Sequence, residues 1–463
     1  MGRRGVAEIG EEHRRDDRHV GAAEQCQTEQ KPPVRGARGS CGRERVGAHR
    51  ESLLEAGAAS GAPSRAGRRP ASSHIIGWAP EAGTSRPSRR TGVWSPRQQR
   101  RRGSRVGWGL GRAIDLETIG VGVIGCGGIA RHAHLTSYKQ LESQGVKIVA
   151  VADVVPELVE RVKAEFDVPY GYLDYRDLLR HDEIHAVSVC TPNYLHKQPT
   201  VDALDAGKHV LVEKPLAMNA AEGREMVEAA RRNGRQLQVG FMSRFQSNSQ
   251  ALKRFIEAGE LGEIYYARAQ SLRRRGIPGW GVFTQKDKQG GGPLIDIGVH
   301  ILDLTLWLMG HPKPVAASGQ TYTKFGTREG IVGLMGQWDP KNYTVEDFGV
   351  GFVRFANGAT LTLEASFALN LEKDVHNTEL FGTEGGASWS PLKLFFERNR
   401  TLLDATPHRL PEVKPYFEEV RAFIEAIRTG TPVPVPGEEA LVTTMILDAI
   451  YRSSELGHEV PVE

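Results

Sequence analysis

Asp296 and His300 lie four residues apart in an apolar segment that follows three consecutive glycines, Gly290 to Gly292. On a helical turn the two side chains would project from one face. A carboxylate beside an imidazole can orient the ring and raise its basicity, as removal of a proton from an alcohol requires. The pattern also fits a histidine buried in the core with Asp296 as a helix cap, and the spacing alone leaves both interpretations open.

The second group of candidates is a glycine-rich turn, G-C-G-G-I-A, which directly follows a short apolar run. In this G-x-G-x-x-A pattern Gly125 permits a tight turn and Gly127 lets the backbone approach a pyrophosphate. Ala130 keeps the following helix close to the strand. That helix begins at Gly128 and Ile129, where backbone N–H groups favour phosphate charge. The turn therefore predicts a dinucleotide site.

Asp153 stands at the end of an apolar run over residues 147–152 that is typical of a second strand. A carboxylate in this position hydrogen-bonds the ribose hydroxyls of an adenosine and repels a 2′-phosphate. The sequence therefore predicts NAD as the cofactor, with NADP as the alternative. The other interpretation of Asp153 is an ordinary turn residue at the end of a strand.

Alternating strands and helices must position these groups. Apolar strand patterns and helical patterns alternate through residues 119–124, 147–152, 156–165, 186–190, 196–206 and 209–212. Such repeated βα units predict an α/β Rossmann-type domain with a doubly wound parallel sheet, whose ligands bind at the carboxyl ends of the strands. The polar residues expected at those ends, and so predicted to bind the cofactor, are Thr191, Pro192, Asn193, His196, Glu213 and Lys214.

The second half of the chain loses this alternation. Strand patterns recur at residues 264–272, 314–324, 349–355, 359–367, 376–381 and 394–397. Asn357-Gly358 between two of them is typical of a β-hairpin. The sequence therefore predicts an α+β domain with a large, mainly antiparallel sheet, followed by a C-terminal helix that packs back on the core. The predicted division is 1–114 as a leader, 115–240 as the dinucleotide domain and 241–463 as the substrate and oligomerisation domain.

Three motifs in order carry a family resemblance: G-C-G-G-I-A, then T-P-N-Y-L-H, then A-G-K-H-V-L-V-E-K-P. Together they resemble the Gfo/Idh/MocA oxidoreductases, named after glucose–fructose oxidoreductase and inositol 2-dehydrogenase, over residues 117–463. The D-x-G-x-H pattern matches the family's catalytic segment. The resemblance implies that His300 accepts the alcohol proton, that Asp296 holds His300 in its tautomer, and that Lys214 hydrogen-bonds the reacting oxygen.

The resemblance also implies a function. It implies an NAD(P)-dependent dehydrogenase that transfers a hydride between nicotinamide and a secondary alcohol of a sugar or cyclitol, working as a homodimer or homotetramer through an open sheet face. The alternatives are an NAD-dependent glycosidase that oxidises its substrate transiently, or a non-catalytic NAD-binding regulator. Arg244 is expected near the cleft, with structural pairing as the alternative. Trp280 lies in a loop that would cover the substrate or be an ordinary surface loop.

Composition separates the leader from the rest of the chain. Residues 1–114 contain 22 Arg, one Lys and 11 acidic residues, a net charge of +12, whereas the remaining chain carries 37 basic and 45 acidic residues, a net charge of −8. This composition predicts a dispensable, disordered extension. One interpretation is an artefact of the assigned gene start, and the alternative is a basic tail that contacts nucleic acid.

Patterns for other sites are missing from the sequence. Four scattered cysteines form neither a disulfide framework nor a paired metal-ligand set, and we therefore expect no metal and a reduced, cytoplasmic compartment. The sequence contains no stretch of about 20 uninterrupted apolar residues, and we therefore expect no membrane partner.

Overall fold

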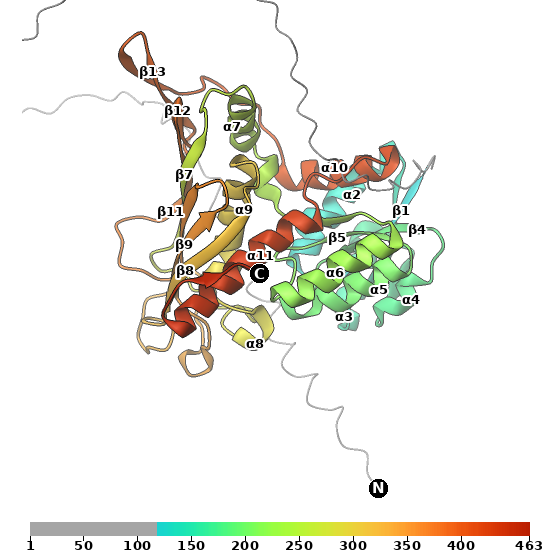
Figure 1. Cartoon of the computed structure of the whole chain (residues 1–463). Helices are drawn as coiled ribbons and strands as arrows, with labels where there is room; N and C mark the ends of the chain where they lie inside the picture. Colours follow the sequence, from blue (N-terminus) through green and yellow to red (C-terminus); the bar gives the residue numbers. More distant parts are fainter. Residues whose placement is uncertain (1–117) are drawn as a thin grey trace, which may run out of the picture. The chain divides into compact units, whose positions relative to one another are not determined.

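The computed structural model describes residues 118–463, which form two β-sheets with helices packed against them (Figure 1). The predicted boundary at residue 114 and the basic leader lie outside the described residues. The predicted fold class, a Rossmann-type sheet followed by a large and mostly antiparallel sheet, is confirmed.

The first sheet, sheet A, has six parallel strands in the order β3-β2-β1-β4-β5-β6. All six side chains of β1 and all four of β5 are buried, because helices cover both faces of the sheet. This burial explains why the strands read as continuous apolar runs. The strands are β1 (Ile119–Ile124), β2 (Val146–Ala152), β3 (Tyr170–Tyr172), β4 (Ile184–Val189), β5 (His209–Val212) and β6 (Leu237–Val239).

Two helical layers enclose sheet A (Figure 1). One layer consists of η3 (Ala130–Leu135), α2 (Thr136–Gln140), α3 (Pro156–Phe166) and α10 (Pro415–Thr429). The other consists of α4 (Tyr175–Leu179), α5 (Lys197–Asp205) and α6 (Ala220–Asn233). Helix α10 comes from near the end of the chain, and its Val420 and Phe423 share a core with β1. The sequence analysis did not predict this helix.

The second sheet, sheet B, has nine strands in the order β14-β13-β12-β11-β7-β10-β9-β8-β15. Its neighbouring strands are antiparallel except for β7 and β10. The strands are β7 (Ile264–Leu272), β8 (Pro314–Tyr322), β9 (Phe348–Phe355), β10 (Thr360–Ser366), β11 (Val375–Gly382), β12 (Gly385–Ser388), β13 (Lys393–Arg398), β14 (Thr401–Ala405) and β15 (Val460–Pro461). The predicted Asn-Gly hairpin joins β9 to β10, with Gly358 at a φ of 86°.

Helices cover the inner face of sheet B (Figure 1). Helix α9 (Val299–Leu308) packs against β7 and β11, and α11 (Gly437–Leu456) packs against β8. Helix α11 also contacts α6, so the last long helix returns to the core as predicted. The remaining helices are α7 (Ser247–Glu257), α8 (Lys286–Gln289) and the short η4 (Glu142–Gln144), η5 (Asn193–Leu195), η6 (Met242–Phe245), η7 (Leu294–Gly298) and η8 (Pro340–Asn342).

Candidate active site

The glycine-rich turn has the shape that a pyrophosphate requires. Gly125 has a φ of 93°, and a Cβ there would lie 2.7 Å from the carbonyl oxygen of Cys190, so a side chain is excluded at this position. A Cβ on Gly127 would meet nothing within 4 Å, which leaves open space directly above the backbone. The first helical residues after the turn are Gly128 and Ile129, both half-buried. These residues fit a dinucleotide as the sequence predicts.

Asp153 is tied to this turn. Its Oδ2 accepts a hydrogen bond from the backbone N–H of Cys126 at 2.7 Å, and its Oδ1 accepts one from Val155 at 2.9 Å. The carboxylate is half-buried, so it holds the turn and still reaches the surface where a ribose would lie. Val154, the next residue, is 72% exposed and offers no cation to a 2′-phosphate.

The loop after β4 meets the turn after β5 through His196. Its Nδ1 lies 2.7 Å from the carbonyl oxygen of Pro215 and its Nε2 lies 2.8 Å from that of Thr191. The ring is 1% exposed, and burial lowers its pKa. The structure therefore corrects the expectation that His196 contacts the cofactor directly: both ring nitrogens face the backbone, and the ring fixes the two loops together.

The other residues of these loops differ in exposure. Pro192 is exposed, Thr191 is half-buried, and the side-chain amide of Asn193 donates to the carbonyl oxygen of Gln289. This last bond connects the cofactor loop to α8, just before the three glycines of the second half. Thr191 and Pro192 thus stay accessible to a ligand at the carboxyl edge of sheet A.

Glu213 supports the following turn from below. It is 6% exposed, its Oε1 lies 3.0 Å from Nε2 of His134, and its Oε2 accepts from the backbone N–H of Lys214 at 3.1 Å. The other ring nitrogen of His134, Nδ1, is hydrogen-bonded to the hydroxyl of Ser188, and this hydroxyl is also hydrogen-bonded to the hydroxyl of Tyr138. Glu213 was predicted as a cofactor residue, and the structure gives its carboxylate to the protein instead. The network fixes the backbone from which Lys214 projects.

Lys214 and Asp296 meet across 82 residues of sequence. Nζ of Lys214 donates to Oδ1 of Asp296 at 2.9 Å and to its carbonyl oxygen at 3.1 Å. The side chains are 21% and 12% exposed, so the pair is largely shielded from water. Two of the three predicted catalytic residues are therefore in contact, although Lys214 follows β5 of sheet A and Asp296 precedes α9.

His300 lies beside this pair without a hydrogen bond. Its Nδ1 is buried and has no partner among the described residues, and its ring makes an edge contact with Phe241 at 6.1 Å between centroids. Burial lowers the pKa of His300 well below its usual value, and electrostatic interactions with Lys214, His376 and Arg273 lower it further. The imidazole is therefore neutral near neutral pH and able to accept a proton.

One expectation about this histidine needs correction, and two of its neighbours were not predicted. Asp296 does not orient His300, because the Oδ1 of Asp296 is bound to Lys214 and, in residues 118–463, no hydrogen bond joins the two. The sequence analysis also missed Arg273, which directly follows β7, and His376, which lies in β11. Only the cross-strand pairing of β7 with β11 brings them to His300, and a sequence without that pairing does not reveal them.

The catalytic segment has an unusual backbone. Residues Leu294–Gly298 form a π-helical turn, η7, before α9 continues as a regular α-helix. Such single π-turns often occur at functional sites. Glu346 fixes the start of this turn: its carboxylate accepts from the backbone N–H groups of Gly292 and Leu294 and from the hydroxyl of Tyr451. The sequence analysis did not identify Glu346 or Tyr451.

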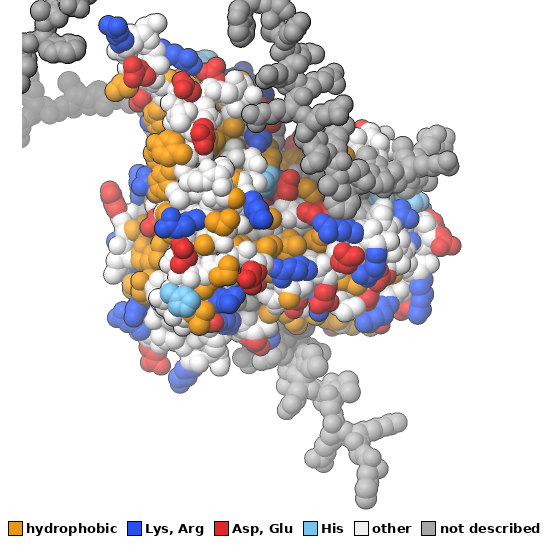
Figure 2. Space-filling model, in the orientation of Figure 1, with side chains coloured by type: hydrophobic (Ala, Val, Ile, Leu, Met, Phe, Trp, Pro, Cys, Tyr) orange, Lys and Arg blue, Asp and Glu red, His pale blue; other side chains and the backbone are white. Residues whose placement is uncertain are grey.

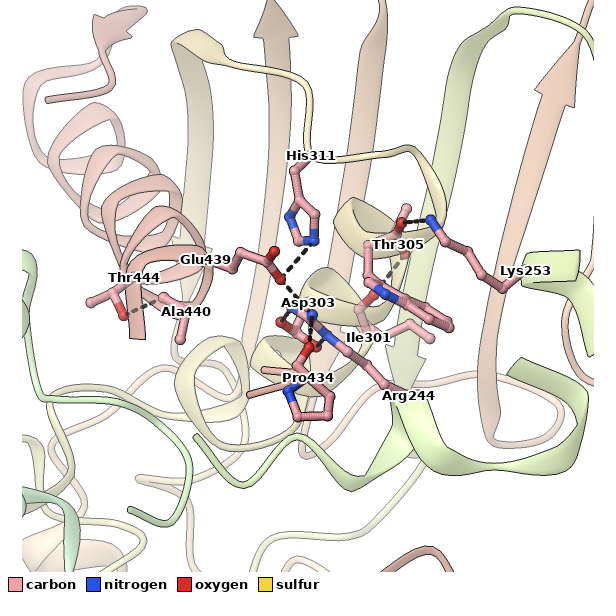
Figure 3. Close-up of polar contacts among 11 residues, drawn as sticks. Arg244, Lys253, Ile301, Asp303, Thr305, His311, Pro434, Glu439, Ala440 and Thr444 are labelled. Carbon is pink, nitrogen blue, oxygen red and sulfur yellow. Dashed lines mark hydrogen bonds and ion pairs between the residues drawn. The ribbon is translucent and has the colours of Figure 1, made fainter. Parts of the chain in front are cut away.

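Arg244 is not in the cleft. It is 2% exposed, and its guanidinium binds Asp303 of α9 through Nε at 2.8 Å and Nη2 at 2.6 Å. Nη1 binds Glu439 and the carbonyl oxygen of Pro434 (Figure 3). The structure thus corrects the expectation of a substrate contact, since every guanidinium nitrogen already has a protein partner.

Trp280 lies in the loop between β7 and α8. It is half-buried and makes an edge contact with Phe283, with ring centroids 6.2 Å apart. In the described part of the chain the Trp280 ring pairs with Phe283 and the His300 ring with Phe241. Its role in covering a substrate stays a prediction.

Two further properties bear on partners. Between Thr118 and Glu463, no group of three or more His, Cys, Asp and Glu side chains could hold a metal ion. The stretch Lys286–Leu308 has the length and composition of a membrane span, yet 89% of its most apolar window is buried inside the fold. This stretch contains the catalytic segment and α9, and core helices have the same composition.

Comparison with known proteins identifies the family. Residues 119–241 match the model described as "Oxidoreductase family, NAD-binding Rossmann fold", and residues 249–388 match the "GFO/IDH/MocA C-terminal domain". The chain belongs to the Gfo/Idh/MocA family. The predictions of this family, of an oxidoreductase and of an NAD-binding domain are confirmed.

Relatives with named activities cover the described residues almost end to end. The D-glucoside 3-dehydrogenase of Escherichia coli is 35% identical over 350 residues, which is 75% of this chain and 99% of the relative. The scyllo-inositol 2-dehydrogenase (NAD(+)) of Bacillus subtilis is 28% identical over 69% of this chain and 90% of its own length. A solved levoglucosan dehydrogenase in complex with NADH and levoglucosan is 26% identical, with a TM-score of 0.65 over 74% of this chain and 99% of that structure.

Proposed function

We propose that this Gfo/Idh/MocA protein is an NAD-dependent dehydrogenase that oxidises a secondary hydroxyl group of a sugar to a ketone. The observation that carries the proposal is the arrangement of three residues: the Lys214–Asp296 ion pair lies beside a neutral imidazole, His300, that has no partner on its buried nitrogen. A cation and a base at one point are what alcohol oxidation needs, since one offsets charge on oxygen and the other removes the proton.

The cofactor site would use residues of sheet A. The turn at Gly125 and Gly127 would hold the pyrophosphate, Asp153 the adenosine ribose, and Thr191 and Pro192 the accessible edge next to the nicotinamide. NAD supplies the acceptor for the hydride that leaves the substrate carbon. The open space above Gly127 and the exposed position after Asp153 support this placement.

The chain's own residues would handle the proton. His300 takes the hydroxyl proton as the C–H bond of the same carbon breaks, and the ring is neutral beforehand because burial and neighbouring cations disfavour its charged form. Lys214 donates a hydrogen bond to the reacting oxygen and offsets its developing negative charge. Asp296 keeps the ammonium of Lys214 in place through their 2.9 Å contact.

The substrate that we propose is a glucoside oxidised at a ring hydroxyl. The support is the 35% identity with a D-glucoside 3-dehydrogenase over 99% of that protein's length. The experiment is an NAD-reduction assay with methyl glucosides, free glucose, levoglucosan and inositols in parallel. We expect the highest kcat/KM with a glucoside. Reduction with inositols alone would overturn the choice of substrate, and no reduction with any polyol would overturn the proposed activity.

We further propose that two copies associate through the outer face of sheet B, which no described helix covers. This face presents stacked aromatic pairs, Tyr266 with Phe381 and Tyr322 with Phe348. Figure 2 shows hydrophobic side chains interspersed with charged ones along the side where sheet B lies. Sedimentation of the wild type and of Phe348→Glu tests this, because a dimer should dissociate in the variant and a monomeric wild type would overturn it.

We also propose a cellular compartment for this protein from the state of its cysteines. Cys126 and Cys190 are buried free thiols near the cofactor turn. Reduced thiols of this kind suit a cytoplasmic enzyme, which we therefore propose.

A further inference from the structure

Arg244 is the centre of a buried polar cluster that joins three distant segments of the chain. Arg244 lies in η6, just after the last strand of sheet A, Asp303 lies in α9, and Glu439 lies in the first turn of α11. Figure 3 shows the side chains of Asp303 and Glu439 converging on the guanidinium, with His311 on the far side of Glu439. The cluster thus connects sheet A to the helix that carries His300.

The contacts leave the guanidinium little freedom. Asp303 is 0% exposed and receives two parallel hydrogen bonds, at 2.6 and 2.8 Å, and Nη1 lies 2.6 Å from Glu439. A bidentate pair of arginine and carboxylate fixes both distance and plane. Removing one partner leaves the other charge buried without compensation, and the structure then has a strong reason to rearrange.

Helix α9 is held at this one side and again at its end. Asp303 stands three residues after His300, so the two are neighbours on the surface of the helix. At the end of α9, Nζ of Lys253 donates to the carbonyl oxygen of Trp307 at 2.8 Å and lies 5.0 Å from the centroid of the Trp307 ring. A rotation or slide of α9 at Asp303 would therefore move His300 by a similar amount.

We infer that Arg244 is a positioning residue for the reaction: through Asp303 it sets where α9 places His300 relative to Lys214. Lys214 belongs to sheet A, and His300 belongs to the helix on sheet B, so their relative position depends on contacts between the two parts. Arg244 supplies such a contact from the sheet A side. The inference rests on the proposed function in assigning His300 the role of base.

The reason for a kinetic effect is geometric. Misplacement of a reacting group by about 1 Å can cost about 10²-fold in rate. Arg244→Lys keeps the positive charge but replaces the two-donor fork with a single ammonium, so α9 would lose its fixed angle without losing charge balance. Asp303→Asn keeps the shape and removes the charge. Both changes lie away from the Gly125 turn and from Asp153.

The test uses the full chain with NAD and methyl β-D-glucopyranoside. For Arg244→Lys and Asp303→Asn we expect kcat to fall about 10- to 100-fold with unchanged NAD affinity by fluorescence titration. The primary isotope effect with the carbon-deuterated glucoside should rise. A second measurement needs no substrate: in the free enzyme, the NMR titration of the His300 ring, assigned with His300→Gln, should move up toward ordinary histidine values in both variants.

Two controls keep the inference distinct from simple destabilisation. Val162→Ala weakens the core between α3 and sheet A, and α3 packs on β2 and β3 rather than on η6 or α9. At temperatures well below melting, it should leave kcat and the His300 titration unchanged even where its melting temperature falls as far as that of Arg244→Lys. Glu439→Gln, whose side chain is 32% exposed, leaves the Asp303 pair intact and should give a smaller effect of the same kind.

The outcomes separate cleanly. Wild-type kcat, isotope effect and His300 titration in Arg244→Lys and Glu439→Gln would overturn the inference and leave the cluster a structural one. An equal loss in Val162→Ala would also overturn it. If no polyol is oxidised by the wild type, the proposed function fails, whereas the His300 titration in the free enzyme still decides whether Arg244 positions α9.

Discussion

The cofactor side of this protein, which consists of the glycine-rich turn and the loops after β4 and β5, differs from the segment Asp296–His300 in how its polar side chains are bonded. On the cofactor side, Asp153 binds backbone N–H groups, His196 faces two carbonyl oxygens, and Glu213 is held by His134. In the catalytic segment, Nδ1 of His300 is buried with no partner in the described chain. Buried polar groups are almost always paired, so the unpaired nitrogen of His300 needs an explanation, as do unpaired atoms elsewhere in the fold such as the carboxylate of Glu419.

The difference indicates which part is complete before the substrate arrives. The cofactor turn is already rigid, because its hydrogen bonds are internal and a dinucleotide adds to them. One nitrogen of His300 instead has no hydrogen-bond partner, and burial together with the charges of Lys214 and Arg273 keeps the ring neutral. The catalytic segment is thus fixed at its backbone by Glu346 and at its helix by Asp303, while the reactive ring stays unpartnered.

The largest effect should come from the unpartnered ring itself. His300→Ala removes the proposed base, and we expect kcat to fall by about 10²- to 10⁴-fold, the usual contribution of a positioned acid–base group. NAD affinity should hardly change, because the cofactor contacts lie on sheet A. Steady-state kinetics with a glucoside and fluorescence titration with NAD measure the two quantities. Near wild-type turnover would make the histidine structural, with Lys214 as the next candidate for the base.

The same ring predicts a pH profile that differs from that of an ordinary solvated histidine. A histidine in water would titrate near pH 6.5, whereas burial and the neighbouring charges of Lys214 and Arg273 lower the pKa of His300 well below that value. In the free enzyme, the base form is therefore present throughout the neutral range, and kcat/KM should rise with pH only on the acid side of about pH 6.5. A limb at higher pH that disappears in His300→Ala would contradict this assignment.

A smaller effect should follow from changing Asp153, whose carboxylate is hydrogen-bonded to the glycine-rich turn. Asp153→Asn keeps one acceptor for the N–H of Cys126 and removes the charge that would meet a 2′-phosphate. We expect NAD to bind about 10-fold more weakly, since hydrogen bonds to a charged group contribute about 1.5–3 kcal/mol, and we expect the preference for NAD over NADP to narrow. Parallel titrations with both cofactors measure this, and an unchanged ratio would remove Asp153 from the ribose site.

The last prediction concerns the stability of sheet A, in which His209 is the first residue of β5. Burial, together with smaller contributions from Arg235 and His185, lowers the pKa of His209 to about 4, while its Nδ1 accepts from the backbone N–H of Gln236. A lowered folded-state pKa stabilises the fold above the unfolded value of about 6.5, and this stability is lost as the pH falls.

Between about pH 7.5 and pH 5, His209 should account for about 2 kcal/mol of lost stability. Urea unfolding at both pH values should show this loss in the wild type and not in His209→Gln. The exposed His458 serves as the matched control, and His458→Gln should keep the full loss. An equal acid loss in His209→Gln and the wild type would show that other groups are responsible.

The sequence predicted what depends on local pattern and on the order of motifs. Strands β1, β2, β4 and β5 of sheet A, the glycine turn and the Asn-Gly hairpin follow from apolar periodicity and turn chemistry, so their positions agree with the structure. The family motifs added Lys214 and Asp296, which prove to be in direct contact.

What the sequence did not predict depends on contacts between distant segments. Helix α10 packs on sheet A although it follows all but one strand of sheet B, and nothing in its own residues specifies that partner. Arg244 was expected in the cleft because it follows β6, yet Asp303 binds it from a helix 59 residues away. Partners of this kind appear only when the fold is assembled.

The most direct test of the central claim, net oxidation of a sugar hydroxyl with His300 as the base, is the stoichiometry of NADH formed from excess NAD and methyl β-D-glucopyranoside. The account predicts one NADH for each keto-glucoside, accumulating with time, with no methanol released and with the rate lost in His300→Ala. Methanol released without net NADH would identify a glycosidase that recycles its cofactor. NAD binding without either product would identify a regulator, and each of these two results would contradict the account.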